Sequence, residues 1–254
     1  NQSFRVPSSV HDEATRMIKH VQGRIEKKWN PREDHGNVSY HYKIDELPLE
    51  EGQWMILART NYIANRVAVD LKNNGDLFWR NGNGWSVAKS TLDVVRGFTK
   101  LTRGLEIDKE EISQVWRKIK VDRKIRTAGN KMLKATEFET FGIEFLESLT
   151  QQYLQEKHWY EVLEVSDQER IYITSVLQSG EKFDDENPRI VLSTIHKAKG
   201  GEADNVALLL ESTKACCTLS EPDAERRVFY VGATRAKQKL FVVDNPEARW
   251  RFQL

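Results

Sequence analysis

One stretch decides the fold of this sequence: ERRVFYVGATRAKQKLFVV, residues 225–243. Its first part has the apolar spacing of an amphipathic helix, which we predict over about 223–236, and it runs on into the apolar residues 240–243. A helix that leads into a short run rich in Val and Phe is typical of a domain in which helices cover a sheet. The stretch therefore predicts an α/β fold.

The same alternation of strands and helices continues upstream. Apolar runs of strand length, rich in Val, Ile and Leu, alternate with helical patterns, and this predicts a mostly parallel sheet with helices on both faces. We predict strands at 38–44, 53–58, 189–193 and 206–210, and helices at 8–28 and 62–73.

The middle of the chain has a different texture. Residues 78–182 are rich in Lys, Glu and Gln and show helical periodicity over 107–125, 137–149 and 168–177. We interpret this region as a mainly helical insertion in the α/β domain. The expected organisation is a first part of the sheet domain over 1–77, the insertion over 78–182, and a second part of the sheet domain over 183–254.

Charge and composition exclude several classes of protein. Lys and Arg total 39 against 38 Asp and Glu, so any contact with a polyanion must be local. No apolar run approaches the roughly 18 residues of a membrane span, and we expect no membrane partner. The cysteines, at 216 and 217, are adjacent, which disfavours a disulfide and favours a reducing, cytoplasmic setting. Because the chain begins without Met and enters patterned sequence at once, we expect it to be part of a longer protein.

No convincing P-loop is present. A phosphoryl-transfer motor needs a glycine-rich loop with a Lys for the phosphates and a strand-end carboxylate for Mg²⁺. Residues 82–90 contain a Lys-Ser pair, but Ala88 stands where the closing glycine belongs, and no buried strand leads into them. The acidic residues 183–186 follow no apolar strand and are better explained as a solvated turn. We expect the isolated chain not to hydrolyse ATP.

Residues 225–236 resemble motif VI of the UvrD/Rep-like family of superfamily 1 DNA helicases almost position for position. In that family the Arg of the Thr-Arg-Ala step reaches across an inter-domain cleft to the γ-phosphate, so the resemblance assigns this role to Arg235. A guanidinium delivered by a second, moving body stabilises charge on the transferred phosphoryl group. The alternative is an amphipathic helix whose Arg side chains are only solvated.

A second stretch, STIHKAKGGEADNV at 193–206, looks like motif V of the same family. It departs from the family at Gly201 and Ala203, where a Leu and an aromatic residue are more usual, which affects how this loop packs. The resemblance assigns single-stranded DNA contacts to Thr194 and His196, and nucleotide contacts to Gly200 and Glu202.

The first five residues, NQSFR, are similar to motif IV of the family. There the aromatic residue stacks on adenine and the Arg contacts a phosphate. The resemblance therefore assigns Phe4 and Arg5 to ATP binding, with Arg5 as a second catalytic cation beside Arg235. Stacking needs only the aromatic face, which Phe4 supplies.

The segment ILARTN at 56–61 resembles the family's Arg-Thr-Asn segment and follows a predicted buried strand. Ligands of open α/β sheets gather outside the carboxyl ends of the strands. We assign Arg59 and Asn61 to DNA contact, whereas Thr60 is as well explained as a helix cap.

Together these resemblances imply the second RecA-like domain of an ATP-dependent DNA helicase. They imply ATP and Mg²⁺ as cofactors, with the metal ligands and the P-loop on a first RecA-like domain in cis, single-stranded DNA as substrate, and movement 3′ to 5′. The expected setting is DNA repair, DNA replication of a plasmid or phage, or transcription-coupled displacement, and the residues do not distinguish these. Two alternatives stay open: a non-enzymatic, helicase-like adaptor that binds DNA or protein, and a motor fused to a nuclease.

Overall fold

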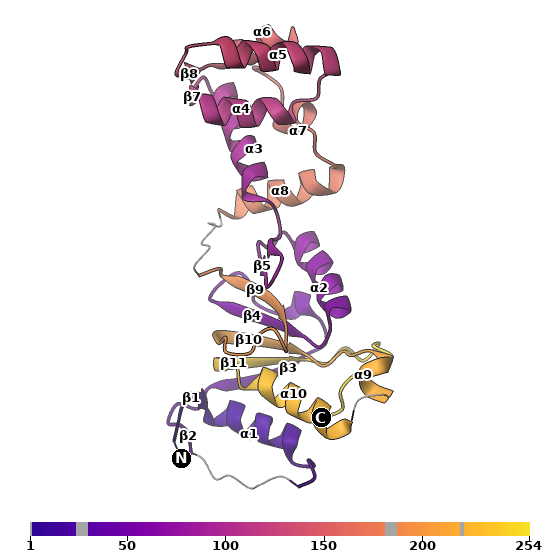
Figure 1. Cartoon of the computed structure of the whole chain (residues 1–254). Helices are drawn as coiled ribbons and strands as arrows, with labels where there is room; N and C mark the ends of the chain where they lie inside the picture. Colours follow the sequence, from indigo (N-terminus) through magenta and orange to yellow (C-terminus); the bar gives the residue numbers. More distant parts are fainter. Residues whose placement is uncertain (1, 24–29, 181–186, 219–220) are drawn as a thin grey trace. The chain divides into compact units, whose positions relative to one another are not determined.

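The computed structural model describes residues 2–23, 30–180, 187–218 and 221–254, and the side chains of residues 2–5 and 30 lie outside this description. The acidic residues at 183–186 therefore also lie outside it. The chain divides into two compact units, Asn1–Ser86 with Glu181–Leu254, here called the sheet unit, and Val87–Gly180, here called the helical unit. Both are drawn in Figure 1, and each is described by itself.

The sheet unit is built on a seven-stranded sheet in the order β3-β11-β10-β4-β9-β5-β6. All neighbouring strands pair in parallel except β5 and β6, which form an antiparallel hairpin. The predicted α/β fold with a mostly parallel sheet is confirmed, and it is consistent with a RecA-like architecture. The strands are β3 (Asn37–His41), β4 (Trp54–Ala58), β5 (Trp79–Arg80), β6 (Gly84–Trp85), β9 (Ile190–Thr194), β10 (Ala203–Leu209) and β11 (Ala236–Val243).

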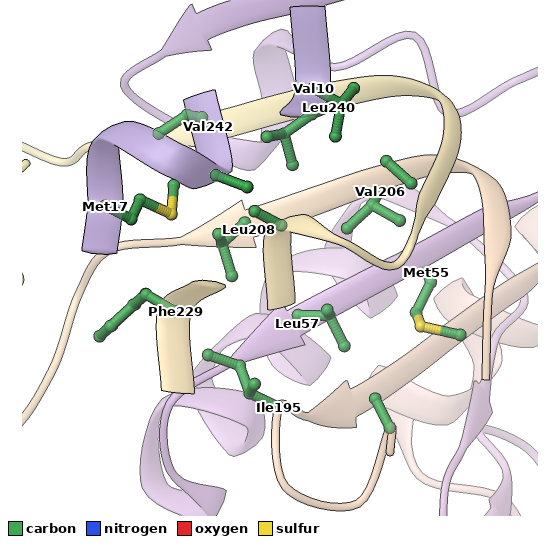
Figure 2. Close-up of a cluster of buried hydrophobic side chains, with 14 of the residues drawn as sticks. Val10, Met17, Met55, Leu57, Ile195, Val206, Leu208, Phe229, Leu240 and Val242 are labelled. Atoms are coloured by element: carbon green, nitrogen blue, oxygen red, sulfur yellow. The ribbon is translucent and has the colours of Figure 1, made fainter. Parts of the chain in front are cut away.

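Helices cover both faces of this sheet because successive strand residues point to opposite sides. In β10, Val206 and Leu208 join the cluster under α1 (Ser8–Ile18) and α10 (Pro222–Ala233). Ala207 and Leu209 join the opposite cluster, under α2 (Asn61–Asn74) and the 3₁₀ helix η1 (Ile44–Glu46). Figure 2 shows the first cluster, in which Phe229 of α10 and Val10 and Met17 of α1 meet side chains of the central strands.

Several boundaries in the sheet unit differ from those expected. The helix predicted over 8–28 ends at Ile18, where two turns follow, one of them closed by a hydrogen bond from Val21 N to Ile18 O, and the last part of the prediction, 24–28, lies outside the described residues. The strand predicted over 38–44 ends at His41, because Ile44 begins η1. The helix predicted over 223–236 ends at Ala233, so Arg235 lies between α10 and β11 rather than on the helix.

The hairpin of β5 and β6 was not expected. The sequence predicts that residues 78–86 belong to the insertion, but β5 pairs in parallel with β9 and so extends the main sheet. Its turn is allowed by Gly82 and Gly84, which both have positive φ. A further small sheet pairs β1 (Gln2–Pro7) with β2 (Asn30–Arg32), and the five-residue α9 (Lys214–Thr218) follows β10.

The helical unit contains shorter helices than the periodicity suggested. The pattern over 107–125 is divided between α4 and α5 because Asp108 and Asp122 each cap a new helix with their side chains. The pattern over 137–149 yields α6 only from Ile143, whereas that over 168–177 lies within α8. In the described ranges, no helix is long and apolar enough to cross a bilayer. The elements are α3 (Lys89–Thr102), β7 (Ile107–Asp108), α4 (Lys109–Lys118), α5 (Arg123–Ala135), β8 (Thr140–Phe141), α6 (Ile143–Thr150), α7 (Trp159–Val162) and α8 (Asp167–Ser179).

Gly129, in the middle of α5, allows a close approach to the buried ring of Trp116. A Cβ at this position would lie 2.2 Å from Trp116 Cζ2. Replacing a helical glycine by alanine ordinarily stabilises by about 1 kcal/mol, whereas overpacking a core costs about 1–3 kcal/mol. Because the contact is so close, we expect the overpacking cost to exceed the helix gain, so that Gly129→Ala lowers the free energy of unfolding by up to about 2 kcal/mol, measured by urea denaturation. Lys131→Ala, at an exposed position of the same helix, is the control, and a stabilised Gly129→Ala variant would contradict this account of the packing.

Candidate nucleotide and nucleic-acid site

The parallel strands give the sheet two distinct edges, and the candidate residues divide between them. Arg59 and Asn61 follow β4, and Thr194 and His196 lie at and just after the end of β9. Because β4 and β9 are parallel neighbours, their carboxyl ends meet, and Ile195 N donates to Ala58 O at 3.0 Å. The four residues assigned to DNA from the sequence therefore lie on one edge, here called the carboxyl edge.

Two of these four residues are exposed. Asn61, the first residue of α2, and His196 both face solvent. Thr194 is only 7% exposed, and its Oγ1 accepts from Lys197 N at 3.4 Å. Thr60 caps α2, since its Oγ1 accepts from Ile63 N at 3.4 Å. The side chains of Thr194 and Thr60 thus hold the local backbone, whereas Asn61 and His196 are accessible to a ligand.

The β5–β6 hairpin brings further polar side chains to the carboxyl edge. Asn81 Nδ2 donates to Lys197 O at 3.2 Å and to Ser193 Oγ at 3.3 Å. Arg80 Nη2 donates to Asn61 O at 3.5 Å, and a Cβ on Gly82 would lie 3.0 Å from Lys197 Nζ. Sequence reasoning missed these residues because it placed the hairpin in the insertion, although its Asn-Gly turn was a usable hairpin signal.

Arg59 forms an ion pair with Glu225 of α10. Its Nε donates to Glu225 Oε2 at 2.7 Å and its Nη2 donates to Glu225 Oε1 at 2.6 Å. The two side chains are 14% and 10% exposed. The hydrogen bonds that Arg59 donates to Glu225 raise the pKa of Arg59, and burial opposes this rise. The DNA contact assigned to Arg59 stays a prediction, while its ion pair with motif VI is an observation that the sequence did not suggest.

The candidate nucleotide residues gather at the opposite edge, here called the amino edge. Glu202 precedes β10 and Arg235 precedes β11, and these two strands are parallel neighbours whose first residues, Ala203 and Ala236, pair directly. Arg235 is partly buried, with Nε donating to Val231 O at 2.9 Å and Nη1 donating to Gly201 O at 3.3 Å. The carboxylate residue Glu202 is exposed. The structure therefore brings this cation and this carboxylate together.

The strand β1, which contains Phe4 and Arg5, also lies toward the amino edge. β1 contacts β11, and Pro7 at its end lies against Gly36, which in turn approaches Gln238 O at the start of β11. The side chains of Phe4 and Arg5 lie outside the described part of the chain, so their contacts with a nucleotide stay predictions. Their backbone is on the side of the sheet where Arg235 lies.

Two segments connect the edges. The loop 195–202 leaves β9 at the carboxyl edge and enters β10 at the amino edge, with Gly200 at a φ of 92° that favours glycine. Helix α10 begins beside Arg59, through Glu225, and ends just before Arg235. These are the segments that resemble motifs V and VI, so each joins a candidate DNA residue to a candidate nucleotide residue.

The amino edge has groups suited to parts of a nucleoside triphosphate. A guanidinium suits a phosphate, a carboxylate accepts from sugar hydroxyls, and a glycine turn leaves room for a close ligand. No set of three or more His, Cys, Asp or Glu side chains in the described ranges could hold a metal ion. These groups match the chemistry of a nucleotide, and the described residues supply no set of ligands for magnesium.

Comparison with known proteins supports one relationship. A family model described as "UvrD-like helicase C-terminal domain" matches residues 94–246. This range begins within α3 and contains the rest of the helical unit, the whole of β9, β10 and β11, and both connecting segments. A search of curated proteins found no significant match.

Proposed function

The chain belongs to the family of UvrD-like helicase C-terminal domains, and on this basis we propose that it is the second motor domain of an ATP-dependent translocase on single-stranded DNA. ATP binds between its amino edge and a P-loop domain of the same protein, and the strand lies along its carboxyl edge. The observation that supports this most is the division of the candidate residues between two edges that α10 and the loop 195–202 connect.

At the amino edge, Arg235 serves as the positioned cation. Closure of the two domains brings its guanidinium to the γ-phosphate, where it stabilises the charge that develops during transfer. Glu202 accepts from the ribose, Gly200 leaves room for the nucleotide, and Phe4 and Arg5 contribute a stacking face and a second cation. Bound ATP supplies the free energy of hydrolysis, and the ligands of Mg²⁺ are assigned to the P-loop domain.

At the carboxyl edge, Asn61, His196 and Lys197 provide exposed polar and basic contacts for phosphates and sugars. Thr194 acts by holding the loop that carries His196. Closure moves these contacts relative to those of the P-loop domain, so that each cycle shifts the grip on the strand. Movement 3′ to 5′ is proposed from the family resemblance, and displacement of duplexes with a single-stranded tail on either side tests it.

The proposed function is tested by the ATPase activity of the full-length protein. We expect single-stranded DNA to stimulate hydrolysis severalfold or more, with saturation as the oligonucleotide concentration rises. A purified, folded full-length protein that binds neither ATP nor single-stranded DNA would contradict the proposal and would favour an adaptor that binds protein.

Lys197 gives a quantitative test of the carboxyl edge. Each phosphate contact to a single strand releases about 0.7 counterions, so Lys197→Ala is expected to reduce the slope of log K against log salt by about 0.7. The measurement is a titration of a labelled oligonucleotide with the full-length protein at several salt concentrations. Lys72→Ala, in the last turn of α2 at the far end of that helix, is the matched control and should leave the slope unchanged. Equal slopes for Lys197→Ala and wild type would show that Lys197 does not contact a phosphate of the single-stranded DNA.

A further inference from the structure

The Arg59–Glu225 ion pair is more deeply buried than the other ion pairs of the described residues. Both of its side chains are less than 15% exposed. In the comparable pairs, Arg66–Glu211 and Arg16–Glu13, the arginine is about half exposed. Both guanidinium–carboxylate hydrogen bonds are present, at 2.7 and 2.6 Å. Such a two-point contact fixes the direction of both side chains as well as their distance.

The pair joins two elements that are far apart in the sequence. Arg59 follows β4 directly, and Glu225 lies in the first turn of α10. From Glu225 to Ala233, the last residue of α10, the helix advances eight residues, or about 12 Å. The ion pair therefore holds one end of α10 at the carboxyl edge, and Arg235 follows its other end at the amino edge.

Helix α10 is packed closely against the sheet. Phe229 is fully buried, and its ring stacks on Phe252 with centroids 4.2 Å apart. Gly232 lies so near the sheet that a Cβ there would be 2.7 Å from Leu208 Cδ1. Because cores are close-packed, a helix held in this way transmits a shift at its first turn to its last turn.

We propose that Arg59 and Glu225 are positioning residues, which seat the first turn of α10 on the end of β4 and so set the position of Arg235 at the amino edge. In this role Arg59 acts through Glu225 and not through contact with single-stranded DNA. The effect on hydrolysis rests on the proposed function, whereas the effect on α10 does not.

The burial of both charges explains why removing either Arg59 or Glu225 should free the first turn of α10 from the end of β4. Removal of either partner leaves the other charge enclosed without its counter-ion, which is strongly unfavourable. The first turn of α10 is then expected to move so that the remaining group can reach water. A pair that is only a local stabilising contact would lower stability without changing the order of the last turn of α10.

The first arm of the test measures hydrogen exchange of the amides in residues 228–235 of the whole chain. We expect Glu225→Gln and Glu225→Asp to exchange at least about 10-fold faster than wild type in this segment. Glu225→Asp keeps the charge but shortens the side chain, so it decides the matter should Glu225→Gln fail to fold. The exchanged pair, Arg59→Glu with Glu225→Arg, is expected to return the rate to within about threefold of wild type.

The second arm measures ATP hydrolysis by the full-length protein. A misplaced catalytic group can lower a rate by about 10- to 100-fold, so we expect this fall in kcat for Glu225→Asp, with the KM for ATP changed less than about threefold. Affinity for single-stranded DNA without nucleotide should stay at the wild-type value. Arg66→Gln, in the Arg66–Glu211 pair at the same edge of the sheet, is the control and should alter neither exchange at 228–235 nor kcat.

The outcomes separate the two ideas. Unchanged exchange at 228–235 in both Glu225 variants overturns the positioning role. A Glu225→Asp protein that keeps the wild-type kcat but loses DNA affinity also overturns it, since the pair then acts at the strand. A wild-type protein without DNA-stimulated hydrolysis refutes the proposed function alone, and hydrogen exchange then decides whether the pair positions α10.

Discussion

Arg235→Ala in the full-length protein is expected to reduce DNA-stimulated ATP hydrolysis on the order of 10³-fold, the scale of cations that act on a transferred phosphoryl group. Alanine removes the guanidinium but keeps the main-chain bonds from Arg235 N to Gly232 O and from Ala203 N to Arg235 O. The bonds that Arg235 makes to Val231 O and Gly201 O are made by its side chain alone, so the strands on either side keep their main-chain pairing. The measurement is a steady-state rate at saturating ATP and oligonucleotide.

Arg227→Ala is the matched control for this prediction. Arg227 belongs to the same arginine-rich stretch and is exposed on α10, so its removal should change the rate less than about threefold, as is usual for exposed positions. Affinity for single-stranded DNA without nucleotide should be retained in both variants. An Arg235→Ala protein with a rate within a few-fold of wild type would mean that the cation at the γ-phosphate comes from elsewhere.

Phe229→Ala is expected to lower the free energy of unfolding by about 3–5 kcal/mol, the range for deleting a buried aromatic ring. Phe229 has no exposed surface and stacks on Phe252 at an interplanar angle of 13°. The ring fills the space between α10 and the sheet, where Figure 2 shows it near Leu208 and Ile195. Urea denaturation followed by circular dichroism measures the loss.

Phe138→Ala tests whether this loss comes from burial. Phe138 is 68% exposed, and surface substitutions usually change stability by less than about 0.5 kcal/mol. A loss of unfolding free energy for Phe229→Ala as small as that for Phe138→Ala would show that the packing of α10 on the sheet contributes little.

The sheet was predictable because its signal is local. Trp54–Ala58 is apolar on both faces, and Ile190–Thr194 is apolar over its first three residues, as expected of strands covered by two layers of helices. The glycine that ends α2, Gly75, adopts the left-handed conformation expected of a helix stop. In these segments the local preference and the tertiary environment favour the same structure.

The helix boundaries that the periodicity predicted wrongly depend on competing local contacts. Asp108 and Asp122 are ordinary helix residues in a periodicity count, but each side chain accepts from two amides and begins a new helix.

The strand β5 was missed for a different reason. It has only two residues, so alternation could not identify it, and its pairing with β9 joins residues more than a hundred positions apart. Contacts of this kind arise only when the chain has folded.

The same limit applies to the candidate site. The motifs predicted which segments carry candidate residues, and strand direction placed those segments at two edges. The sequence could not predict that Arg59 would be enclosed with Glu225, 166 residues away, or that the hydroxyl of Thr194 would be used by its own loop. Side-chain partners across such separations follow from packing, which leaves no periodic signal.

The most direct test is an experimental structure of the full-length protein with a non-hydrolysable ATP analogue and a single-stranded oligonucleotide. The central claim predicts the Arg235 guanidinium about 3 Å from a γ-phosphate oxygen, a distance typical of a charged hydrogen bond. It also predicts the oligonucleotide backbone against Asn61 and His196 at the carboxyl edge. A nucleotide bound away from Arg235 and Glu202, or a strand that follows the amino edge, would contradict it.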